Sequence, residues 1–390
     1  MRIFAVAGEH SGDVYASRLI RQLKEQHSQL QLAGVAGPLM RAEGVEPLLP
    51  MEEFQIMGFG AVLAKLPQLY KQFYQVRDTI LAQQPDVTLL VDYPGFNLRL
   101  AKSLRRKGYQ GKLVHYVCPT VWAWGKGRTK TLIQTLDLLL TIFPFEPDIF
   151  SDSGLNACFV GHPLVEALQT HNYDDTWTQQ IGIPPTGKLL GLFPGSRYGE
   201  VKRIIQRQID AACRLQQSDS STRIAISCAG DHVEPLIKEA ALRAGLQVDR
   251  DLFLVPRRYS YELMRDAHSA LACSGTVNLE LALHQTPTVV AYEISTANLL
   301  IMWYVLRLFL PHYSIVNILC DRRVFPEFMI DKFSAEDLYQ ALHPLHVEGQ
   351  TRDRCLEGCQ EAYEALSPST EAEASKVAAN TVTELIRAGS

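Results

Sequence analysis

The sequence predicts two consecutive doubly wound α/β domains, and three observations lead to that prediction. Short apolar runs alternate with amphipathic stretches along most of the 390 residues. The apolar runs are nearly continuous, which is typical of parallel strands buried on both faces of a sheet. The alternation pauses once, over 171–188, and then resumes. The length suits two large domains or three small ones, and the single pause favours two.

The first domain is predicted to span residues 1–170. Its expected strands lie at 3–7, 32–36, 87–92, 112–118, 136–142 and 157–160, with a helix over 14–26. Residues 171–188 contain acidic, amide and proline pairs but few apolar side chains, so they are predicted to form a linker.

The second domain is predicted to span 189–368. Its expected strands lie at 189–193, 223–229, 252–255, 270–273 and 288–291, with helices over 201–216, 233–245, 261–268 and 277–284. A C-terminal helix over 369–390 is expected to pack back on the N-terminal domain of its own chain or of a partner. Because ligands of such sheets bind beyond the carboxyl ends of the strands, we expect two domains that face a central cleft.

Composition excludes several classes of protein. The formal charge of −4 argues against a protein that coats nucleic acid, so no nucleic-acid partner is expected. No apolar run reaches the roughly 20 residues that a membrane-spanning helix needs. The eight cysteines form no C-x-x-C pair and are expected to be free thiols in a reducing cytoplasm. No H-E-x-x-H motif is present, so neither a metal nor a cofactor is predicted.

The first strand-to-helix turn reads Gly8-Glu9-His10-Ser11-Gly12-Asp13. It matches neither the dinucleotide nor the P-loop fingerprint, and its two carboxylates would repel a diphosphate. One interpretation is that Ser11 or Asp13 only caps the helix. The other is that the loop orients or deprotonates a neutral hydroxyl group, with Ser11, Gly12 and Asp13 forming an acceptor loop.

Asp92 follows the buried strand at 87–91 and is expected to face the ligand edge. Partial desolvation there would raise its pKa, as a general base requires; capping of the next helix is the alternative. Glu9 is the second candidate, either positioning the hydroxyl group or acting as the base. Farther along, Trp122 and Trp124 follow another strand end, where they either pack or stack on a sugar.

The second domain offers two turns suited to phosphate. Gly195-Ser196-Arg197 and Ser274-Gly275-Thr276 each follow a strand and precede a helix. Glycine permits close approach of the backbone, helix N-termini offer free N–H groups, and arginine supplies a fixed charge. Glu280 lies one helical turn beyond Thr276, where its carboxylate can bind a ribose diol. Phosphate sites in one domain and carboxylates in the other suggest donor and acceptor halves.

Several motifs in order along the chain resemble the lipid-A-disaccharide synthases. The resemblance rests on residues 8–13, 34–38, 57–58, 91–97, 119–124, 159–163, 194–197 and 274–276, and more loosely on Asn317 and Pro326-Glu327. Alanine is usual in that family where this chain has His10. The resemblance covers nearly the whole chain.

The resemblance implies an inverting, metal-independent hexosyltransferase of glycosyltransferase family 19 with the GT-B fold. The implied reaction joins UDP-2,3-diacylglucosamine to 2,3-diacylglucosamine 1-phosphate, giving the β-1,6-linked lipid A disaccharide 1-phosphate and UDP. It also implies a cytoplasmic protein at the inner face of the cytoplasmic membrane, a homodimer with exchanged C-termini, and Asn317 as a UDP-sugar ligand. The alternatives are a non-hydrolysing UDP-sugar epimerase and a non-catalytic UDP-sugar-binding protein.

A stretch of apolar residues at spacings of three and four suggests how acylated substrates are reached. It comprises Phe59, Val62, Leu63, Leu66, Leu69, Tyr70 and Phe73. The ordinary interpretation is the core face of an amphipathic helix. Since the implied substrates carry acyl chains, we instead predict an exposed strip that holds those chains or touches the bilayer.

Overall fold

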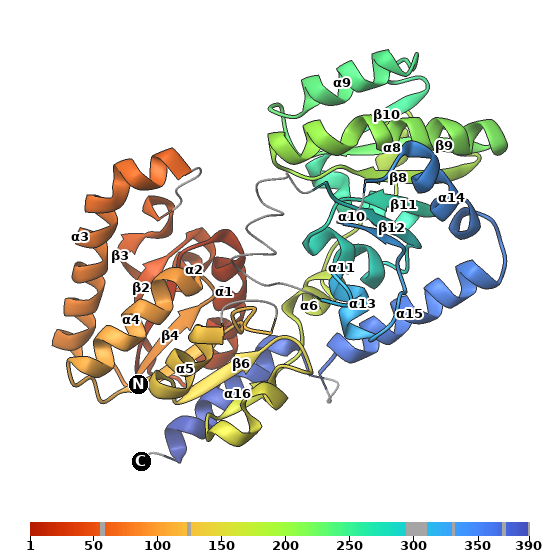
Figure 1. Cartoon of the computed structure of the whole chain (residues 1–390). Helices are drawn as coiled ribbons and strands as arrows, with labels where there is room; N and C mark the ends of the chain where they lie inside the picture. Colours follow the sequence, from red (N-terminus) through yellow and green to blue (C-terminus); the bar gives the residue numbers. More distant parts are fainter. Residues whose placement is uncertain (55–58, 123–125, 294–309, 330–331, 369–371, 389–390) are drawn as a thin grey trace. The chain divides into compact units, whose positions relative to one another are not determined.

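The computed structural model describes residues 1–54, 59–122, 126–293, 310–329, 332–368 and 372–388, with the backbone alone for 59–66 and 126. The chain forms two compact units (Figure 1). Unit 1 consists of Met1–Gln169 and Leu366–Ser390, and unit 2 of Thr170–Ala365.

Unit 1 is built on a parallel sheet of order β3-β2-β1-β4-β5-β6-β7. The strands are β1 (Arg2–Ala7), β2 (Gln31–Ala36), β3 (Glu46–Pro50), β4 (Val87–Val91), β5 (Lys112–Tyr116), β6 (Leu138–Thr141) and β7 (Ala157–Phe159). The helices are α1 (His10–Gln26), α2 (Pro38–Ala42), α3 (Phe59–Gln83), α4 (Pro94–Arg106), α5 (Lys126–Thr135), α6 (Pro163–Gln169) and α16 (Ala374–Arg387), with short 3₁₀ turns at Met51–Glu53 and Pro147–Ser153.

Both faces of this sheet are covered, which explains the continuous apolar runs. Ile3, Ala5 and Ala7 of β1 pack with α1 and α16. Phe4 and Val6, which point to the opposite face, pack with α3 and α4. The edge strand β3 was not predicted, because two of its five residues are prolines, which are confined to sheet edges and bulges.

Unit 2 has a parallel sheet of order β10-β9-β8-β11-β12-β13. The strands are β8 (Lys188–Phe193), β9 (Thr222–Cys228), β10 (Leu252–Pro256), β11 (Ser269–Ala272), β12 (Thr288–Ala291) and β13 (Glu327–Phe328). The helices are α7 (Trp177–Ile181), α8 (Tyr198–Ser218), α9 (Glu234–Arg243), α10 (Ser260–Asp266), α11 (Thr276–Leu283), α13 (Ile315–Leu319), α14 (Ala335–His346) and α15 (Gln350–Leu366), with a 3₁₀ turn at Arg257–Tyr259. The two sheets confirm the predicted fold class.

The segment 171–188, predicted as a linker, is part of unit 2 in the structure. Its helix α7 places Trp177 in the core, fully buried, and the indole N–H donates to Asp266 Oδ2 over 2.7 Å. The segment has few apolar residues, but this one large side chain is sufficient to fix it.

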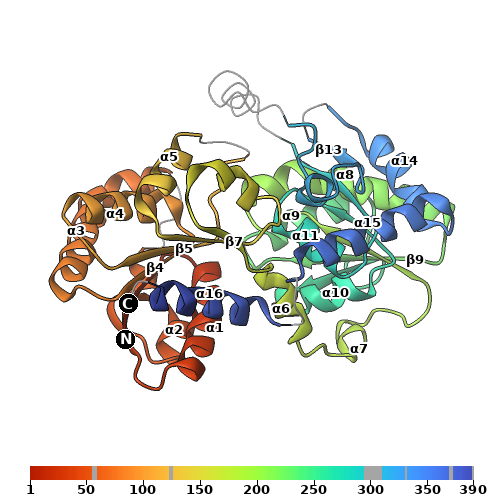
Figure 2. The ribbon, with the colours of Figure 1, turned by 90° about the horizontal axis from the view of Figure 1, so that it is seen from below.

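The C-terminal helix α16 packs on α1, α6 and β6 of unit 1 (Figure 2). The backbone N–H and the hydroxyl of Ser375 both donate to the buried carboxylate of Glu166, each over 3.0 Å. At the other end, the Gln26 amide donates to Asn380 Oδ1 over 2.8 Å. The helix therefore completes the core of its own N-terminal unit.

Candidate active site

The first group of candidate residues lies at the carboxyl ends of β1 and β4 in unit 1. The two strands are neighbours, with Ala7 paired to Val91, so the loops that follow them open at the same edge of the sheet. The Ser11 hydroxyl donates a hydrogen bond to Asp92 Oδ2 over 3.4 Å. The structure thus brings together two loops that are 81 residues apart in the chain.

Asp92 occupies a strained turn that the surrounding residues hold in place. Asp92 and Tyr93 have φ angles of 49° and 46°, in the left-handed region. The buried Asn97 amide donates to the carbonyl oxygens of Val91 (3.3 Å) and Asp92 (2.7 Å). A Cβ on Gly8 would lie 2.4 Å from the Tyr93 ring, so glycine is required beside that ring. Contacts on both sides therefore fix the turn.

Burial changes the acid–base properties of Asp92. It raises the pKa of the carboxyl group, while hydrogen bonds from the Tyr93 backbone N–H and the Ser11 hydroxyl oppose the shift by stabilising the charged form. A carboxylate with a raised pKa accepts a proton more readily than a solvated one. The desolvation and the raised pKa expected of Asp92 at this strand end are therefore present in the structure.

Glu9 lies close to the same turn. It is the N-cap residue of α1, its side chain makes no capping hydrogen bond, and it is exposed. Burial, together with the negative charge of Glu9, raises the pKa of the Tyr93 phenol. Glu9, Ser11 and Asp92 thus form one polar group around Tyr93, and Gly12 packs beneath it, where an added Cβ would lie 3.4 Å from Val91 O.

Asp13 does not belong to this polar group, contrary to the predicted acceptor loop. It is fully buried, and its two oxygens accept the backbone N–H groups of Leu39 and Met40, each over 3.0 Å. These N–H groups lie in the first turn of α2, so Asp13 caps a helix, although not the one that it belongs to. A Cβ on Gly37 would lie 2.3 Å from the Asp13 carboxyl carbon, which explains the glycine at position 37.

The second group of residues lies at the carboxyl ends of β8 and β11 in unit 2. These strands are neighbours, with Phe193 paired to Ala272, so the two glycine turns predicted from sequence meet at one edge. Gly195 has φ of +105°, and a Cβ there would lie 3.0 Å from Cys273 Sγ of the other turn. Glycine is therefore required where the turns touch.

Arg197 and Ser196 stand at the N-terminus of α8. The Arg197 side chain is 82% exposed and its Nη1 lies 2.8 Å from Glu200 Oε1. The Ser196 carbonyl oxygen lies 2.8 Å from His232 Nε2, in the loop after β9. Sequence reasoning missed His232, since a lone histidine in a loop carries no signal of its neighbours. Ser274, Gly275 and Thr276 begin α11 in the same way, and Gly275 is the N-cap.

Glu280 lies farther along α11 and is half-buried. Burial raises the pKa of its carboxyl group, while a hydrogen bond from the Tyr261 hydroxyl (3.4 Å) and the charge of Arg257 oppose the shift. This arrangement leaves Glu280 compatible with the predicted sugar-hydroxyl contact.

The position of Asn317 contradicts its predicted role in UDP-sugar binding. The residue is fully buried in α13, and its amide makes hydrogen bonds within the protein. Asn317 Oδ1 accepts the N–H groups of Val324 (2.9 Å) and Phe325 (2.8 Å), and Nδ2 donates to the Phe325 carbonyl oxygen (2.9 Å). Asn317 therefore holds the 324–325 loop in place.

A cavity of about 480 Å³ adjoins the Tyr93 turn between α3 and α4. It is lined by Leu69, Tyr70, Phe73, Tyr93, Gly95, Phe96 and Arg99. Three residues of the predicted apolar strip, Leu69, Tyr70 and Phe73, line this cavity, and Tyr70 is 59% exposed. The side chains of the other four, Phe59, Val62, Leu63 and Leu66, lie outside the described part of the chain.

A buried acid near β6 was not predicted. Glu146 accepts the Trp122 indole N–H over 3.2 Å and the backbone N–H groups of Ile142 and Phe143, each over 3.2 Å. Burial outweighs these hydrogen bonds and raises the pKa of Glu146 to about 7. Trp122 is thus held by a carboxylate, while Trp124 lies outside the described residues.

A chain with two parallel α/β sheets has the architecture of the GT-B fold. Solved structures with this fold resemble the chain over its full length. A putative UDP-N-acetylglucosamine 2-epimerase from Listeria monocytogenes has a TM-score of 0.65 at 12% identity, covering 100% of this chain and 96% of that one. The calicheamicin glycosyltransferase CalG4 has a TM-score of 0.56 at 13% identity, covering 99% and 98%. At these identities the likeness shows the fold alone.

Sequence comparison gives the family. The lipid-A-disaccharide synthetase family matches residues 3–382. A lipid-A-disaccharide synthase of Chlamydia pneumoniae is 36% identical over 93% of this chain, and one of Paramagnetospirillum magneticum is 34% identical over 100% of this chain and 98% of its own length. The chain belongs to the lipid-A-disaccharide synthetase family. It spans about 60% of the length of the Chlamydia relatives.

Proposed function

We propose that this protein transfers 2,3-diacylglucosamine from its UDP derivative to 2,3-diacylglucosamine 1-phosphate. The products are the β-1,6-linked disaccharide 1-phosphate and UDP. The observation that carries the proposal is the family match over residues 3–382. The full-length relative from Paramagnetospirillum magneticum supports it, since the two chains align over nearly their entire lengths.

The acceptor side of the reaction is assigned to unit 1. Asp92 takes the proton of the acceptor 6-hydroxyl, and the oxygen forms a bond to the anomeric carbon of the donor sugar. The raised pKa of Asp92 and the 3.4 Å hydrogen bond from Ser11 support this role. Glu9 orients the hydroxyl group, or replaces Asp92 as the base.

The donor side is assigned to unit 2. As the new bond forms, the bond between the anomeric carbon and the diphosphate breaks, and UDP leaves with the electron pair. Arg197 and the N-terminal N–H groups of α8 and α11 stabilise the charge that develops on the diphosphate. Glu280 binds sugar hydroxyl groups. Since the turn after β8 touches the turn after β11, one diphosphate can contact both.

An acyl chain of the acceptor is assigned to the cavity between α3 and α4. Its lining is largely aromatic and aliphatic, and it shares Tyr93 with the polar group around Asp92. Burying each methylene group of an acyl chain there contributes about 0.8 kcal/mol.

The family resemblance supports three further proposals. The protein acts in the cytoplasm, it attaches to the inner face of the cytoplasmic membrane, and it forms a homodimer in which the C-terminal segments are exchanged. Within the described residues, none of the helices has the length and apolarity needed to cross a bilayer. In an exchanged dimer, α16 would make its contacts with Glu166 and Gln26 on the partner.

Mass analysis of the products tests the proposed reaction. The protein is incubated with the two diacylated substrates, and we expect one disaccharide 1-phosphate for each UDP released. Since the structural neighbours include epimerases, an epimerase is the second candidate; it would return a UDP-sugar of unchanged mass and no disaccharide. A binding protein would bind UDP-sugar and give no product. Either result would contradict the proposal.

A further inference from the structure

Unit 1 carries a concentration of positive charge that the proposed reaction does not use. The sequence has five basic residues in 94–107 and three in 126–135, with no Asp or Glu in either segment. The chain as a whole has a formal charge of −4. The two segments form α4 and α5, which pack against each other. A single face built from them is therefore strongly cationic.

A groove of about 430 Å³ lies where the two helices meet. It is lined by Lys102, Arg105, Arg106, Gly127, Lys130, Thr131, Gln134 and Thr135. Among the described residues, no carboxylate lines it. Hydroxyl and amide groups of α5 stand among the cations, and such groups also bind phosphate oxygens.

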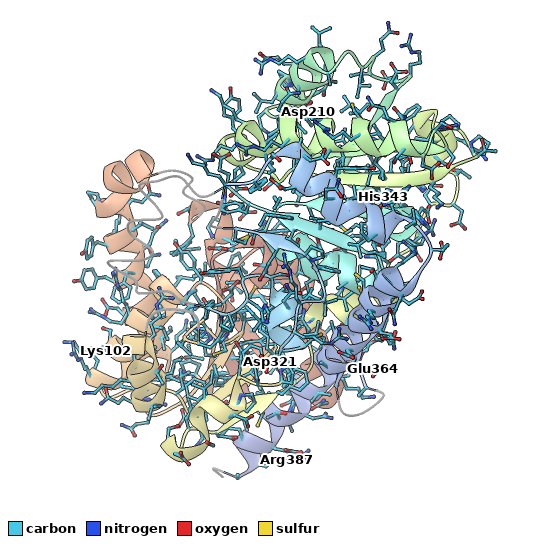
Figure 3. All side chains as sticks on the ribbon, turned by 45° about the vertical axis from the view of Figure 1, so that its right-hand side comes forward. Lys102, Asp210, Asp321, His343, Glu364 and Arg387 are labelled. Atoms are coloured by element: carbon cyan, nitrogen blue, oxygen red, sulfur yellow. The ribbon has the colours of Figure 1, made fainter. Side chains whose placement is uncertain are left out.

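One of the four basic residues of this groove is already bound within the protein, and the other three are not paired with a carboxylate of the described residues. Arg105 is bound to Asp137 and donates to the carbonyl oxygens of Thr135 (3.0 Å), Tyr109 (2.9 Å) and Gly111 (3.0 Å), so it joins α4 to α5. The other three, Lys102, Arg106 and Lys130, are exposed, and within the described part of the chain no carboxylate pairs with them. Lys102 lies at the outer edge of unit 1 (Figure 3). These three charges are available to an external anion.

The basic groove and the apolar cavity are lined by successive turns of α4. Arg99, Lys102 and Arg106 are spaced by three and four residues and so share one face of the helix. Arg99 lines the apolar cavity, and the other two line the groove one turn farther on, about 5 Å along the axis. Tyr70 and Tyr74 of the adjacent α3 are 59% and 48% exposed. Exposed aromatic residues beside basic ones are typical of surfaces that sit at the headgroup level of a bilayer.

We propose that the groove between α4 and α5 binds the phosphate headgroups of anionic phospholipids and docks unit 1 on the bilayer. Three unpaired cations are more than one monophosphate needs. Because they are spread over two helices, they can contact several headgroups of an anionic bilayer at once. The choice of a bilayer over RNA rests on the apolar cavity beside the groove and, in part, on the proposed function, whose substrates are membrane lipids.

Vesicle co-sedimentation tests the proposal. The full chain is mixed with vesicles of phosphatidylcholine and phosphatidylglycerol, or of phosphatidylcholine alone. The groove variant combines Lys102→Gln, Arg106→Gln and Lys130→Gln. Each basic residue near an anionic surface contributes about a fivefold change in affinity, so the variant should bind the anionic vesicles about 100-fold more weakly. Binding by the wild type should fall as salt rises, and binding by the variant should depend on salt much less.

A matched control removes the same charge elsewhere. Arg214→Gln, Lys238→Gln and Arg250→Gln change three exposed residues of unit 2 and should leave vesicle binding unchanged. A second variant keeps the groove charge, with Lys102→Arg, Arg106→Lys and Lys130→Arg, and should bind vesicles like the wild type. If the control variant lost as much affinity as the groove variant, the effect would be net charge alone and the proposal would fail.

Two competitors and one activity assay complete the test. Inorganic phosphate at constant ionic strength and poly(U) RNA should not displace the protein from vesicles; displacement by either would overturn the proposal. Turnover with detergent-dispersed substrates should be the same in the wild type and the groove variant. Charge-dependent vesicle binding without any transferase activity would leave this proposal standing and refute the proposed function.

Discussion

Replacing Asp92 by asparagine separates the chemistry proposed for this side chain from its place in the fold. The amide has nearly the size and shape of the carboxylate. Asparagine also adopts left-handed backbone angles readily, so the φ of 49° is no obstacle. The amide oxygen can still accept the Ser11 hydroxyl. Only the capacity to take a proton is lost.

The expected effects on turnover and on stability have opposite signs. Loss of a general base should reduce turnover about 10²- to 10⁴-fold. Because burial raises the pKa of Asp92, the folded protein holds this proton more tightly than the unfolded chain does. That contribution to stability is present at low pH and is lost as the pH rises through the folded pKa. At pH 7 the folded state therefore contains a partly buried charge, and a neutral amide should be at least as stable.

Three measurements on the same protein samples check this. UDP release gives turnover, calorimetric titration gives the UDP affinity, and urea unfolding gives stability. We expect a large loss of turnover with UDP affinity unchanged and an unfolding midpoint equal to or above that of the wild type. In the wild type, turnover should fall toward low pH with an inflection above about 4, the ordinary aspartate value.

Glu9→Gln is the matched comparison, since it removes the other candidate base from an exposed position. If Glu9→Gln loses more turnover than Asp92→Asn while still binding UDP, the two roles must be exchanged. If Asp92→Asn keeps full turnover and Glu9→Gln does too, neither is the base and the reasoning from burial is refuted.

Arg197→Ala should lower kcat/KM about 30- to 1000-fold and keep its fold, because the side chain is 82% exposed; near-normal turnover would remove Arg197 from the diphosphate site. Asp13→Ala should lower the free energy of unfolding by about 2–5 kcal/mol, since the N–H groups of Leu39 and Met40 lose their acceptors; urea unfolding at unchanged stability would contradict the cap. Burial raises the pKa of Glu146 from 4.5 to about 7, so the folded state holds this proton more tightly than the unfolded chain does. As the pH rises from about 4 to 7, the free energy of unfolding of the wild type should therefore fall by about 3 kcal/mol relative to that of Glu146→Gln. If urea unfolding gave the wild type and Glu146→Gln the same dependence of stability on pH, this prediction would be refuted.

The sequence predicted the fold because its apolar runs report burial on both sheet faces. Where that signal is weak, prediction was less accurate. The strand β3 contains two prolines, and the segment 171–188 depends on one buried tryptophan, Trp177. Neither feature leaves a periodic pattern in the chain.

The sequence predicted only those features of the candidate site that follow from the positions of the parallel strand ends. The predicted strand ends placed Asp92 and Arg197 at the carboxyl edges of their sheets. The sequence does not show which polar side chains are already hydrogen-bonded within the protein. Asp13 and Asn317 are residue types expected of ligand-binding sites, but both make their hydrogen bonds to backbone groups of neighbouring segments of the fold. Only the folded structure shows such pairing.

The configuration of the new glycosidic bond tests the central claim most directly, because that claim is a single displacement of UDP by the acceptor oxygen. The disaccharide 1-phosphate made by the purified protein is isolated, and the coupling constant of its anomeric proton is measured by NMR. Starting from an α-linked UDP donor, one displacement assisted by a base in unit 1 predicts a β linkage. An α linkage would require a different route, such as two successive displacements through a covalent intermediate, and would contradict the roles given to Asp92 and Glu9.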